Sequence, residues 1–515
     1  MKPNILIIMT DQQQAGLRKG AGYVFDTMPN LDRFANEGTD FACAYTPNPT
    51  CSPARTSLFT GRYPSAHRVR TNHNLRDVCF YKDLITVLRE QGYATALCGK
   101  NHSYMNAAKY FDFHAENDHL GNEYGKDRPE SDGLQKKFNE FLKSTKFIDC
   151  ETPSPFPVSC QQPYRNASSF IRFLDSLGSD KPFFAWVSFA EPHNPYQVPK
   201  PYFDMFPPAD LPKLESADID LSEKGERFAW LKGVWDEVIG TDKSRIARMR
   251  SNYLGMLRLI DDQFGRILDS LEERKLDKNT IVIYMSDHGD FVGEYGMMRK
   301  GVDLPDVLTR IPMIWRGPGI APQGRVNDCF VNIVDVMPTI CRMLGVEIPL
   351  GVQGQSICGL LDGTADKEQF NYAYSESGFG GLYWTKNDCL DLCEEGACHK
   401  RETFDCLNSW TQCGSVRMVV KGDYKLQADM MGNYRLYNLK NDRSELKNLW
   451  GKVGYEDISL DMLKTLTTAL IRTNDPLPPP HHRYRIKRSP DNSFRNITIT
   501  EDPGVTKADY AGINN

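Results

Sequence analysis

The sequence predicts an α/β fold, with a mostly parallel sheet sandwiched by helices and a smaller C-terminal α+β subdomain. In the first two-thirds of the chain, short apolar runs that favour strands alternate with amphipathic patterns that favour helices. Strands that are apolar along their whole length are typical of a parallel sheet with both faces covered. Beyond about residue 365 the segments alternate and turn in the manner of antiparallel hairpins.

The first region provides five strands and two clear helices. We expect the strands at Asn4–Met9, Tyr93–Cys98, Phe183–Phe189, Thr280–Ser286 and Pro312–Trp315. We expect the helices at Asp83–Gln91 and from Tyr253 to about Arg274. Connections between parallel strands of one sheet are right-handed, so the crossovers should be right-handed as well.

Three regions follow from this pattern: an α/β domain at 1–365, an α+β subdomain at 366–475 and a tail at 476–515. In the second region, "VRMVVKGDYKLQAD" and "GNYRLYNLKND" predict hairpins, and a helix is expected from about Ser459 to Thr473. The tail begins "PLPPPHHRYRIKRSP", and this Pro-rich, basic composition indicates extended chain. Such a tail either stays loose or wraps a neighbouring subunit of a homo-oligomer.

Composition narrows the class of protein. Charged residues are 25% and hydrophobic residues 40% of the 515, as in ordinary soluble proteins. The net charge of −5 gives no reason to expect nucleic acid as a partner, and no apolar run approaches the roughly 20 residues of a membrane span. The start, "MKPNILIIMTDQ", continues into polar residues where a signal peptide would have its cleavage site. We therefore expect a cytoplasmic protein.

Five of the fourteen cysteines gather in one segment, at about 385–415 within the subdomain. They are Cys389, Cys393, Cys398, Cys406 and Cys413. Disulfides are rare in cytosolic proteins, which makes a zinc site the alternative to weigh. The spacing contains no paired C-x2-C, so we favour a Cys-rich insert near the active site over a zinc site.

The stretch "NPTCSPARTSLFTGRYP" predicts a helix with a cysteine at its beginning. Ser52 suits the N-cap, Pro53 suits the first helical position, and Gly61 suits the C-terminal stop. Cys51 then lies at a helix N-terminus, where unpaired N–H groups and the helix dipole favour an anion. Arg55, one turn into the helix, could hold the same anion or steady residue 51. The alternative is a buried cysteine beside capping residues.

Polar residues end two of the expected strands. Asp11 and Gln12 follow the first strand, and "YMSDHGD" places Asp287 and His288 at the end of another. Ligand sites of α/β folds form at the carboxyl ends of their strands. Two carboxylates with an amide and an imidazole form a credible divalent-cation site.

The segment "CSPARTSLFTGR" resembles the signature of the formylglycine sulfatases, in the alkaline-phosphatase-like superfamily. The resemblance implies that fold, and it implies that a formylglycine-generating enzyme oxidises Cys51 to formylglycine. One oxygen of the hydrated aldehyde would attack sulfur, and the other would later expel sulfate. By the same resemblance the metal site comprises Asp11, Gln12, Cys51, Asp287 and His288.

Other motifs appear in the family's order and imply further roles. In "CGKNH", Lys100 would hold sulfate oxygens and His102 would orient the formylglycine hydroxyl. In "EPHNPY", His193 would be the acid beside the leaving-group oxygen, and Lys300 matches the second sulfate-binding lysine. Asn74 in "RTNHN" is a weaker candidate for a substrate contact, and "NDHLGNEYGKDR" could line a specificity pocket.

The Asp-Gln and Asp-His pairs depart from the Asp-Asp and Asp-Asn of many sulfatases. They resemble the branch of choline sulfatase, arylsulfatase K and phosphonate monoester hydrolase. Calcium is favoured as the metal, and the imidazole also suits manganese. The expected function is hydrolysis of a sulfate monoester, with a sulfated saccharide as substrate. The alternatives are a phosphonate monoester or phosphodiester hydrolase, a choline sulfatase, and a non-catalytic anion- or metal-binding protein on the same fold.

Overall fold

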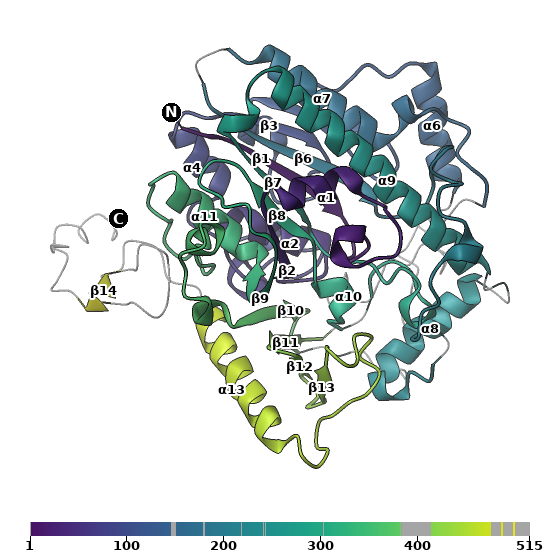
Figure 1. The fold of residues 1–515 in the computed structure, drawn as a ribbon, viewed down its shortest axis with the longest axis vertical. Coiled ribbons are helices and arrows are strands. Elements are labelled where there is room, and N and C mark those ends of the chain that lie inside the picture. Colours follow the sequence, from purple (N-terminus) through teal and green to yellow (C-terminus); the bar gives the residue numbers. More distant parts are fainter. Residues whose placement is uncertain are drawn as a thin grey trace.

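The computed structural model contains a nine-stranded and a four-stranded sheet with helices around them (Figure 1). A third, two-stranded sheet pairs β14 (Ile486–Lys487) with β15 (Thr498–Ile499). It describes residues 2–145, 151–178, 181–217, 219–239, 242, 244–301, 303–381, 383 and 414–474, and the short pieces 486–487 and 498–499. The Cys-rich insert and most of the tail lie outside the described residues, so the predictions made there stay predictions. Across the described part, no helix combines the length and the apolar composition needed to cross a membrane.

The large sheet has nine strands in the order β5-β4-β3-β6-β1-β7-β8-β2-β9. The strands are β1 (Asn4–Asp11), β2 (Thr39–Tyr45), β3 (Ala94–Gly99), β4 (Phe113–Asn117), β5 (Glu123–Tyr124), β6 (Phe183–Pro192), β7 (Thr280–Ser286), β8 (Met313–Arg316) and β9 (Gly324–Asn332). The five central strands β4, β3, β6, β1 and β7 are parallel, as are β2 and β9. Strands β5 and β8 run antiparallel to their neighbours. The predicted mostly parallel sheet is therefore confirmed.

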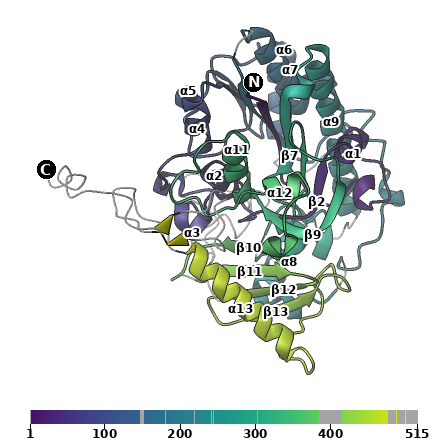
Figure 2. The same cartoon turned by 60° about the vertical axis from the view of Figure 1, so that its left-hand side comes forward.

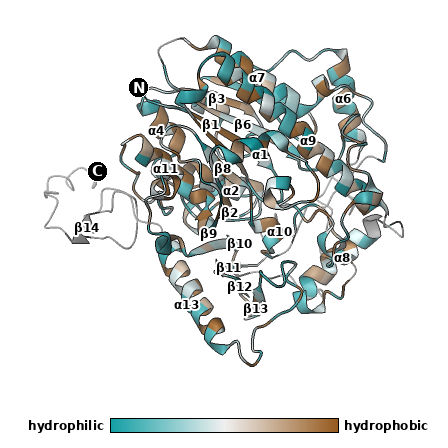
Figure 3. Cartoon of the chain, in the orientation of Figure 1, coloured by the Kyte–Doolittle hydropathy of each residue, from teal (hydrophilic) through white to brown (hydrophobic). Residues whose placement is uncertain are grey.

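Helices cover both faces of this sheet, as predicted. Along β1, Leu6 and Ile8 face one apolar core, and Ile5, Ile7 and Met9 face the other. Helices α1 (Pro29–Asn36), α7 (Gln162–Ser176) and α9 (Ser244–Glu273) contribute to the first core, and α2 (Cys51–Thr60), α4 (Leu84–Glu90) and α11 (Val336–Met343) to the second. In Figure 3 the central strands are coloured hydrophobic, whereas α7 and α9 carry both colours, as expected for helices with one face in water.

The remaining helices are shorter or peripheral. They are α3 (Pro64–His67), α5 (Ala107–Tyr110), α6 (Gly133–Ser144), α8 (Glu226–Ile239), α10 (Asp306–Thr309) and α12 (Cys358–Leu361). The two helices expected from the sequence correspond to α4 and α9, and α9 begins nine residues before the expected start at Tyr253.

The small sheet is antiparallel and has the order β10-β11-β12-β13. Its strands are β10 (Tyr372–Ser377), β11 (Val416–Lys421), β12 (Tyr424–Asp429) and β13 (Tyr434–Asn438). Helix α13 (Glu456–Thr473) packs on one face, where Met462 and Leu466 meet Leu426 and Leu436 (Figure 2). The other face contacts Tyr45 and Leu304 of the large domain. The predicted hairpins and the final helix are confirmed.

Candidate active site

The helix that bears Cys51 begins differently from the sequence prediction. Thr50 is the N-cap, with φ −136° and ψ 137°, and Cys51 is the first helical residue, so Ser52 is not the cap. The physical reason lies in a neighbouring loop: Asn72 Oδ1 accepts the Ser52 N–H at 3.0 Å and satisfies a donor that a capping side chain would otherwise serve. Gly61 ends the helix in the left-handed region, with φ 61°, as predicted.

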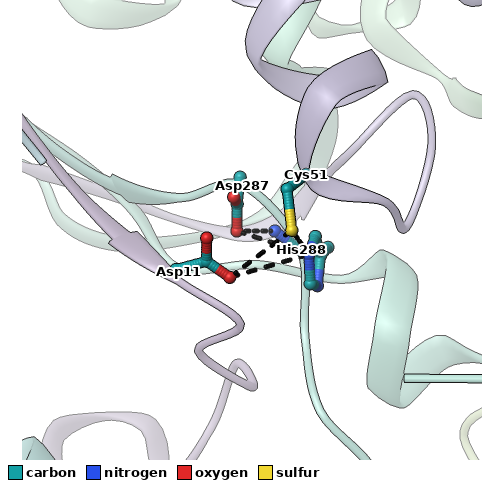
Figure 4. A group of neighbouring side chains, drawn as sticks. All are labelled: Asp11, Cys51, Asp287 and His288. Carbon is teal, nitrogen blue, oxygen red and sulfur yellow. Dashed lines mark hydrogen bonds and ion pairs between the residues drawn. The ribbon is translucent and has the colours of Figure 1, made fainter. Parts of the chain in front are cut away.

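Four of the predicted metal-site residues come together in one buried cluster (Figure 4). Strands β1 and β7 are paired in register from Asn4–Thr280 to Thr10–Ser286, which brings Asp11 and Asp287 to the same edge. The Cys51 Sγ lies 3.2 Å from His288 Nε2 and 3.6 Å from Asp11 Oδ1. His288 Nε2 is 3.7 Å from Asp287 Oδ1 and 3.9 Å from Asp11 Oδ1.

Arg55 bridges the carboxylates of Asp11 and Asp287 through their Oδ2 atoms, whereas His288 lies near their Oδ1 atoms. Its Nη2 donates to Asp11 Oδ2 at 3.0 Å, and its Nε donates to Asp287 Oδ2 at 2.9 Å. Its Nη1 donates to Ser188 Oγ at 2.8 Å and to the Lys100 carbonyl at 3.0 Å. The two roles that the sequence suggested for Arg55, an anion contact and a contact to residue 51, stay predictions. In the structure the guanidinium holds the two carboxylates.

The two carboxyl groups respond differently to burial. Desolvation acts to raise the pKa of Asp11, but Lys100, His193 and Arg55 outweigh it and hold that pKa well below the usual range. The pKa of Asp287 is raised, first by burial and then by the charge of Asp11. The cluster therefore concentrates negative charge beside residue 51, which a cation would stabilise.

The donor atoms of the cluster fit a divalent cation. Arg55 occupies the Oδ2 atoms, so the Oδ1 atoms of Asp11 and Asp287 both lie toward His288 Nε2. The other ring nitrogen, Nδ1, lies 2.9 Å from the Gly289 carbonyl, and this contact fixes the ring's orientation. Burial acts to lower the pKa of His288, but Asp287 and Cys51 raise it to about 9. A cation would take the place of the Nε2 proton in this set of oxygen and nitrogen donors.

Gln12 borders the cluster with a backbone φ of 69°. Its Oε1 accepts from Lys300 Nζ at 3.2 Å, and its Nε2 donates to Asp290 Oδ2 at 2.6 Å. The Tyr196 hydroxyl donates to the same Asp290 oxygen at 2.7 Å. Sequence reasoning did not identify Asp290, although it stands in the "SDHGD" motif. Asp290 fixes the amide of Gln12 beside the metal cluster.

Positively charged groups lie near the Cys51 thiol and oppose the effect of Asp11 on its pKa. The Lys300 Nζ lies 3.7 Å from Cys51 Sγ and 3.3 Å from His193 Nε2. Burial and Asp11 act to raise the pKa of Cys51, but Lys100, Lys300 and the nearby imidazole of the metal cluster lower it to about 7. The structure thus brings the predicted Lys300 to residue 51 and the predicted His193 to Lys300.

Lys100 and His102 follow β3. The Lys100 Nζ contacts Asp11 Oδ2 and lies 2.6 Å from His119 Nε2. His102 is partly buried and has a φ of 44°, and burial lowers its pKa. The role of His102 toward the formylglycine hydroxyl stays a prediction.

Two further residues make contacts that the sequence did not predict. His119, from the loop between β4 and β5, stacks on His193 with ring centroids 3.8 Å apart and an interplanar angle of 22°. It lies within the stretch assigned to a specificity pocket, but no motif marks it. Asn74, the weaker substrate candidate, holds its own turn: its Oδ1 accepts the Arg70 N–H at 3.0 Å and its Nδ2 donates to the Arg68 carbonyl at 2.8 Å.

Comparison with known proteins identifies the family of this chain. The family model described as Sulfatase matches residues 3–346, which is more than half of the chain. This chain belongs to the sulfatase family. The sulfatase is 27% identical over 492 residues to the arylsulfatase of Clostridium perfringens, a match that covers 90% of this chain and 94% of that one. It is a sulfuric ester hydrolase, and the resemblance drawn from the sequence is confirmed.

Solved structures agree on the fold of the sulfatase. The phosphonate monoester hydrolase of Agrobacterium radiobacter superposes with a TM-score of 0.74 at 21% identity, over 97% of this chain and 100% of that chain. A structure in complex with its substrate D-glucosamine-2-N,6-O-disulfate has a TM-score of 0.69 at 20% identity, over 92% of this chain and 98% of that chain. Together they confirm the alkaline-phosphatase-like fold.

Proposed function

We propose that this sulfatase hydrolyses a sulfate monoester of a carbohydrate, with residue 51 as formylglycine and a divalent cation beside it. One observation carries the proposal: Cys51 begins α2 within the metal cluster and beside Lys300. Its Sγ is 3.6 Å from Asp11 Oδ1 and 3.7 Å from Lys300 Nζ. A nucleophile in this place contacts the groups that would activate it and also the groups that would bind the sulfate.

The chain's own residues would bind and orient the sulfate group. Lys100 and Lys300 would hold its oxygens and oppose the negative charge that grows on them. When bound, Ca²⁺ or Mn²⁺ held by Asp11, Gln12, Asp287 and His288 would supply Lewis-acid polarisation at residue 51. Arg55 would keep both carboxylates turned toward that ion.

His193 is the proposed acid for the leaving oxygen. Its Nδ1 lies 2.7 Å from the Asn194 carbonyl, which fixes the ring with Nε2 toward Lys300. Burial, His119 and Lys300 lower the pKa of His193, so without substrate the ring is neutral. The negative charge of a bound sulfate ester would offset the lysines and allow the ring to carry the proton that it donates to the departing alcohol.

A saccharide is the proposed substrate class. One structural neighbour binds a glucosamine disulfate, which supports sugar sulfates as ligands of this fold. We further propose that a formylglycine-generating enzyme matures the protein, because the Cys-type signature at residue 51 requires oxidation. The cytoplasm is the proposed compartment.

A second candidate is hydrolysis of phosphonate monoesters or phosphodiesters. The observation that favours it is the TM-score of 0.74 to a phosphonate monoester hydrolase over 97% of this chain. Tetrahedral sulfur and phosphorus groups need similar lysine and metal contacts, so the same residues would serve either substrate.

The test is release of sulfate from a panel of sulfated mono- and disaccharides, run beside a matched phosphodiester and a phosphonate monoester. The proposal predicts release from one or two saccharides by the wild type and none by Cys51→Ala. A Cys43→Ala variant, which removes a thiol outside the cluster, should keep full activity. Release of phosphate or phosphonate products alone, from protein that carries the aldehyde, would favour the second candidate.

A further inference from the structure

His119 contacts Lys100 and His193, two of the three groups proposed to act on the substrate. Its Nε2 lies 2.6 Å from Lys100 Nζ, and its ring stacks on His193 at 3.8 Å. It comes from the loop between β4 and β5, whereas Lys100 follows β3 and His193 follows β6. A single side chain therefore connects two separate strand ends at the site.

We propose that His119 is a positioning residue that fixes the ammonium of Lys100 and the ring of His193. The inference rests on the proposed function of these two residues. A lysine ammonium is a donor only, so His119 Nε2 accepts its hydrogen bond and the His119 ring is neutral. Lys100 also contacts Asp11, so its ammonium is held from two sides.

The two imidazoles of the stacked pair each face a lysine ammonium. Lys100 approaches His119 Nε2 to 2.6 Å, whereas Lys300 approaches His193 Nε2 only to 3.3 Å. When a bound sulfate ester offsets the charge of Lys300, His193 would carry the proton for the leaving oxygen. His119 would stay neutral as the acceptor for Lys100, so the stacked pair would carry one positive charge and not two.

Stacking also closes one face of the His193 ring. The backbone carbonyl of Asn194 and the ammonium of Lys300 fix the ring at its two nitrogens, and His119 covers a face. Covering the face keeps water away and sustains the desolvation that lowers the pKa of His193. The titratable groups around the pair are Lys100, Lys300, Asp11, His102 and Glu191.

Two substitutions separate the two functions of His119. The His119→Phe variant keeps an aromatic face for His193 but removes the acceptor for Lys100. The His119→Gln variant keeps an acceptor for Lys100 but removes the aromatic face. The exposed His73, changed to Phe and to Gln, is the matched control and should leave kcat and KM unchanged.

We expect His119→Phe to raise KM and to weaken inhibition by inorganic sulfate about tenfold, because a hydrogen bond to a charged group is lost. Its pH profile of kcat should keep the wild-type basic limb. We expect His119→Gln to keep KM within about twofold, because an acceptor for Lys100 remains. It should lower kcat about tenfold, because the His193 ring loses the stacked face that fixes it. Its basic limb should move to higher pH, because water reaches His193 and its pKa rises.

Equal losses in both variants, with no split between KM and kcat and no movement of the basic limb, would show a merely structural role and overturn the inference. Changes of less than twofold in both variants would overturn it as well. Binding of inorganic sulfate, measured by calorimetry, keeps the two proposals apart. If the wild type released no sulfate from any ester, the proposed function would fail. A tenfold weaker Kd in His119→Phe but not in His119→Gln would still support the positioning of Lys100, and equal Kd values would refute it.

Discussion

Replacing Arg55 with alanine tests how the buried negative charge of the site is held. Arg55, Asp11 and Asp287 have fully buried side chains, and the guanidinium is 3.0 Å and 2.9 Å from the two carboxylates. Both carboxylates lose Arg55 in the variant, but Lys100 remains on Asp11, so the larger loss falls on Asp287. Breaking one buried ion pair costs about 3–5 kcal/mol. We expect the free energy of unfolding to fall by about that amount in EDTA.

Calcium should return part of this loss, because a cation between the carboxylates replaces the missing positive charge. The assay is urea unfolding of the wild type and of Arg55→Ala, each in EDTA and in excess Ca²⁺. Arg18, buried and paired with Asp32 and Asp40 elsewhere, provides the control. The Arg18→Ala variant should lose stability by the same amount in both buffers. The reasoning would be refuted if Arg55→Ala lost less than about 1 kcal/mol in EDTA. It would also be refuted if Ca²⁺ reduced the loss relative to wild type no more in Arg55→Ala than in Arg18→Ala.

Three further changes test the fold and the metal site. In Gly289→Ala the new Cβ would lie 1.9 Å from the Val307 carbonyl, so we expect a loss of about 1–3 kcal/mol by thermal unfolding, whereas Gly233→Ala, with open space around it, should cost nothing. Two arginines outweigh burial and hold the pKa of Asp306 well below its usual range, so Asp306→Asn should destabilise at pH 7. The pKa of an aspartate in the unfolded chain is about 3.9, so the difference in free energy of unfolding between Asp306→Asn and wild type should shrink as the pH falls below 4. Urea titrations measure it, and a difference that stays constant with pH would contradict the low pKa of Asp306. EDTA should abolish sulfatase activity and Ca²⁺ or Mn²⁺ should restore it, but neither ion should restore Asp287→Asn, and full activity in EDTA would exclude the metal site.

The sequence predicts those parts of the fold in which local pattern and burial agree. β7 coincides with the expected Thr280–Ser286, because an apolar run between polar residues leaves little choice of register. Strands β2 and β9 were not expected from the sequence, because Asp40 interrupts the apolar positions of β2 and Asn327 with Asp328 those of β9. These strands form because each finds a partner in the sheet, which is a long-range event that local composition does not encode.

The candidate site divides in the same way. Residues at strand ends, such as Asp11 and Asp287, could be placed together because parallel strands bring their carboxyl ends to one edge. His119 could not, because its position depends on how the loop after β4 folds back over the site. The predicted N-cap of α2 was wrong for a related reason. Asn72 lies in a loop after the helix, and its side chain supplies an acceptor that Ser52 was expected to provide.

The central claim is that residue 51 acts as formylglycine, and conversion measured against activity tests it most directly. Preparations with graded amounts of the aldehyde can be made by expressing the chain with and without a formylglycine-generating enzyme. The fraction converted is then read from the mass of the tryptic peptide that contains Cys51. The account predicts that sulfate release rises in proportion to that fraction and approaches zero in unconverted protein. Equal activity from protein that retains the Cys51 thiol would contradict it.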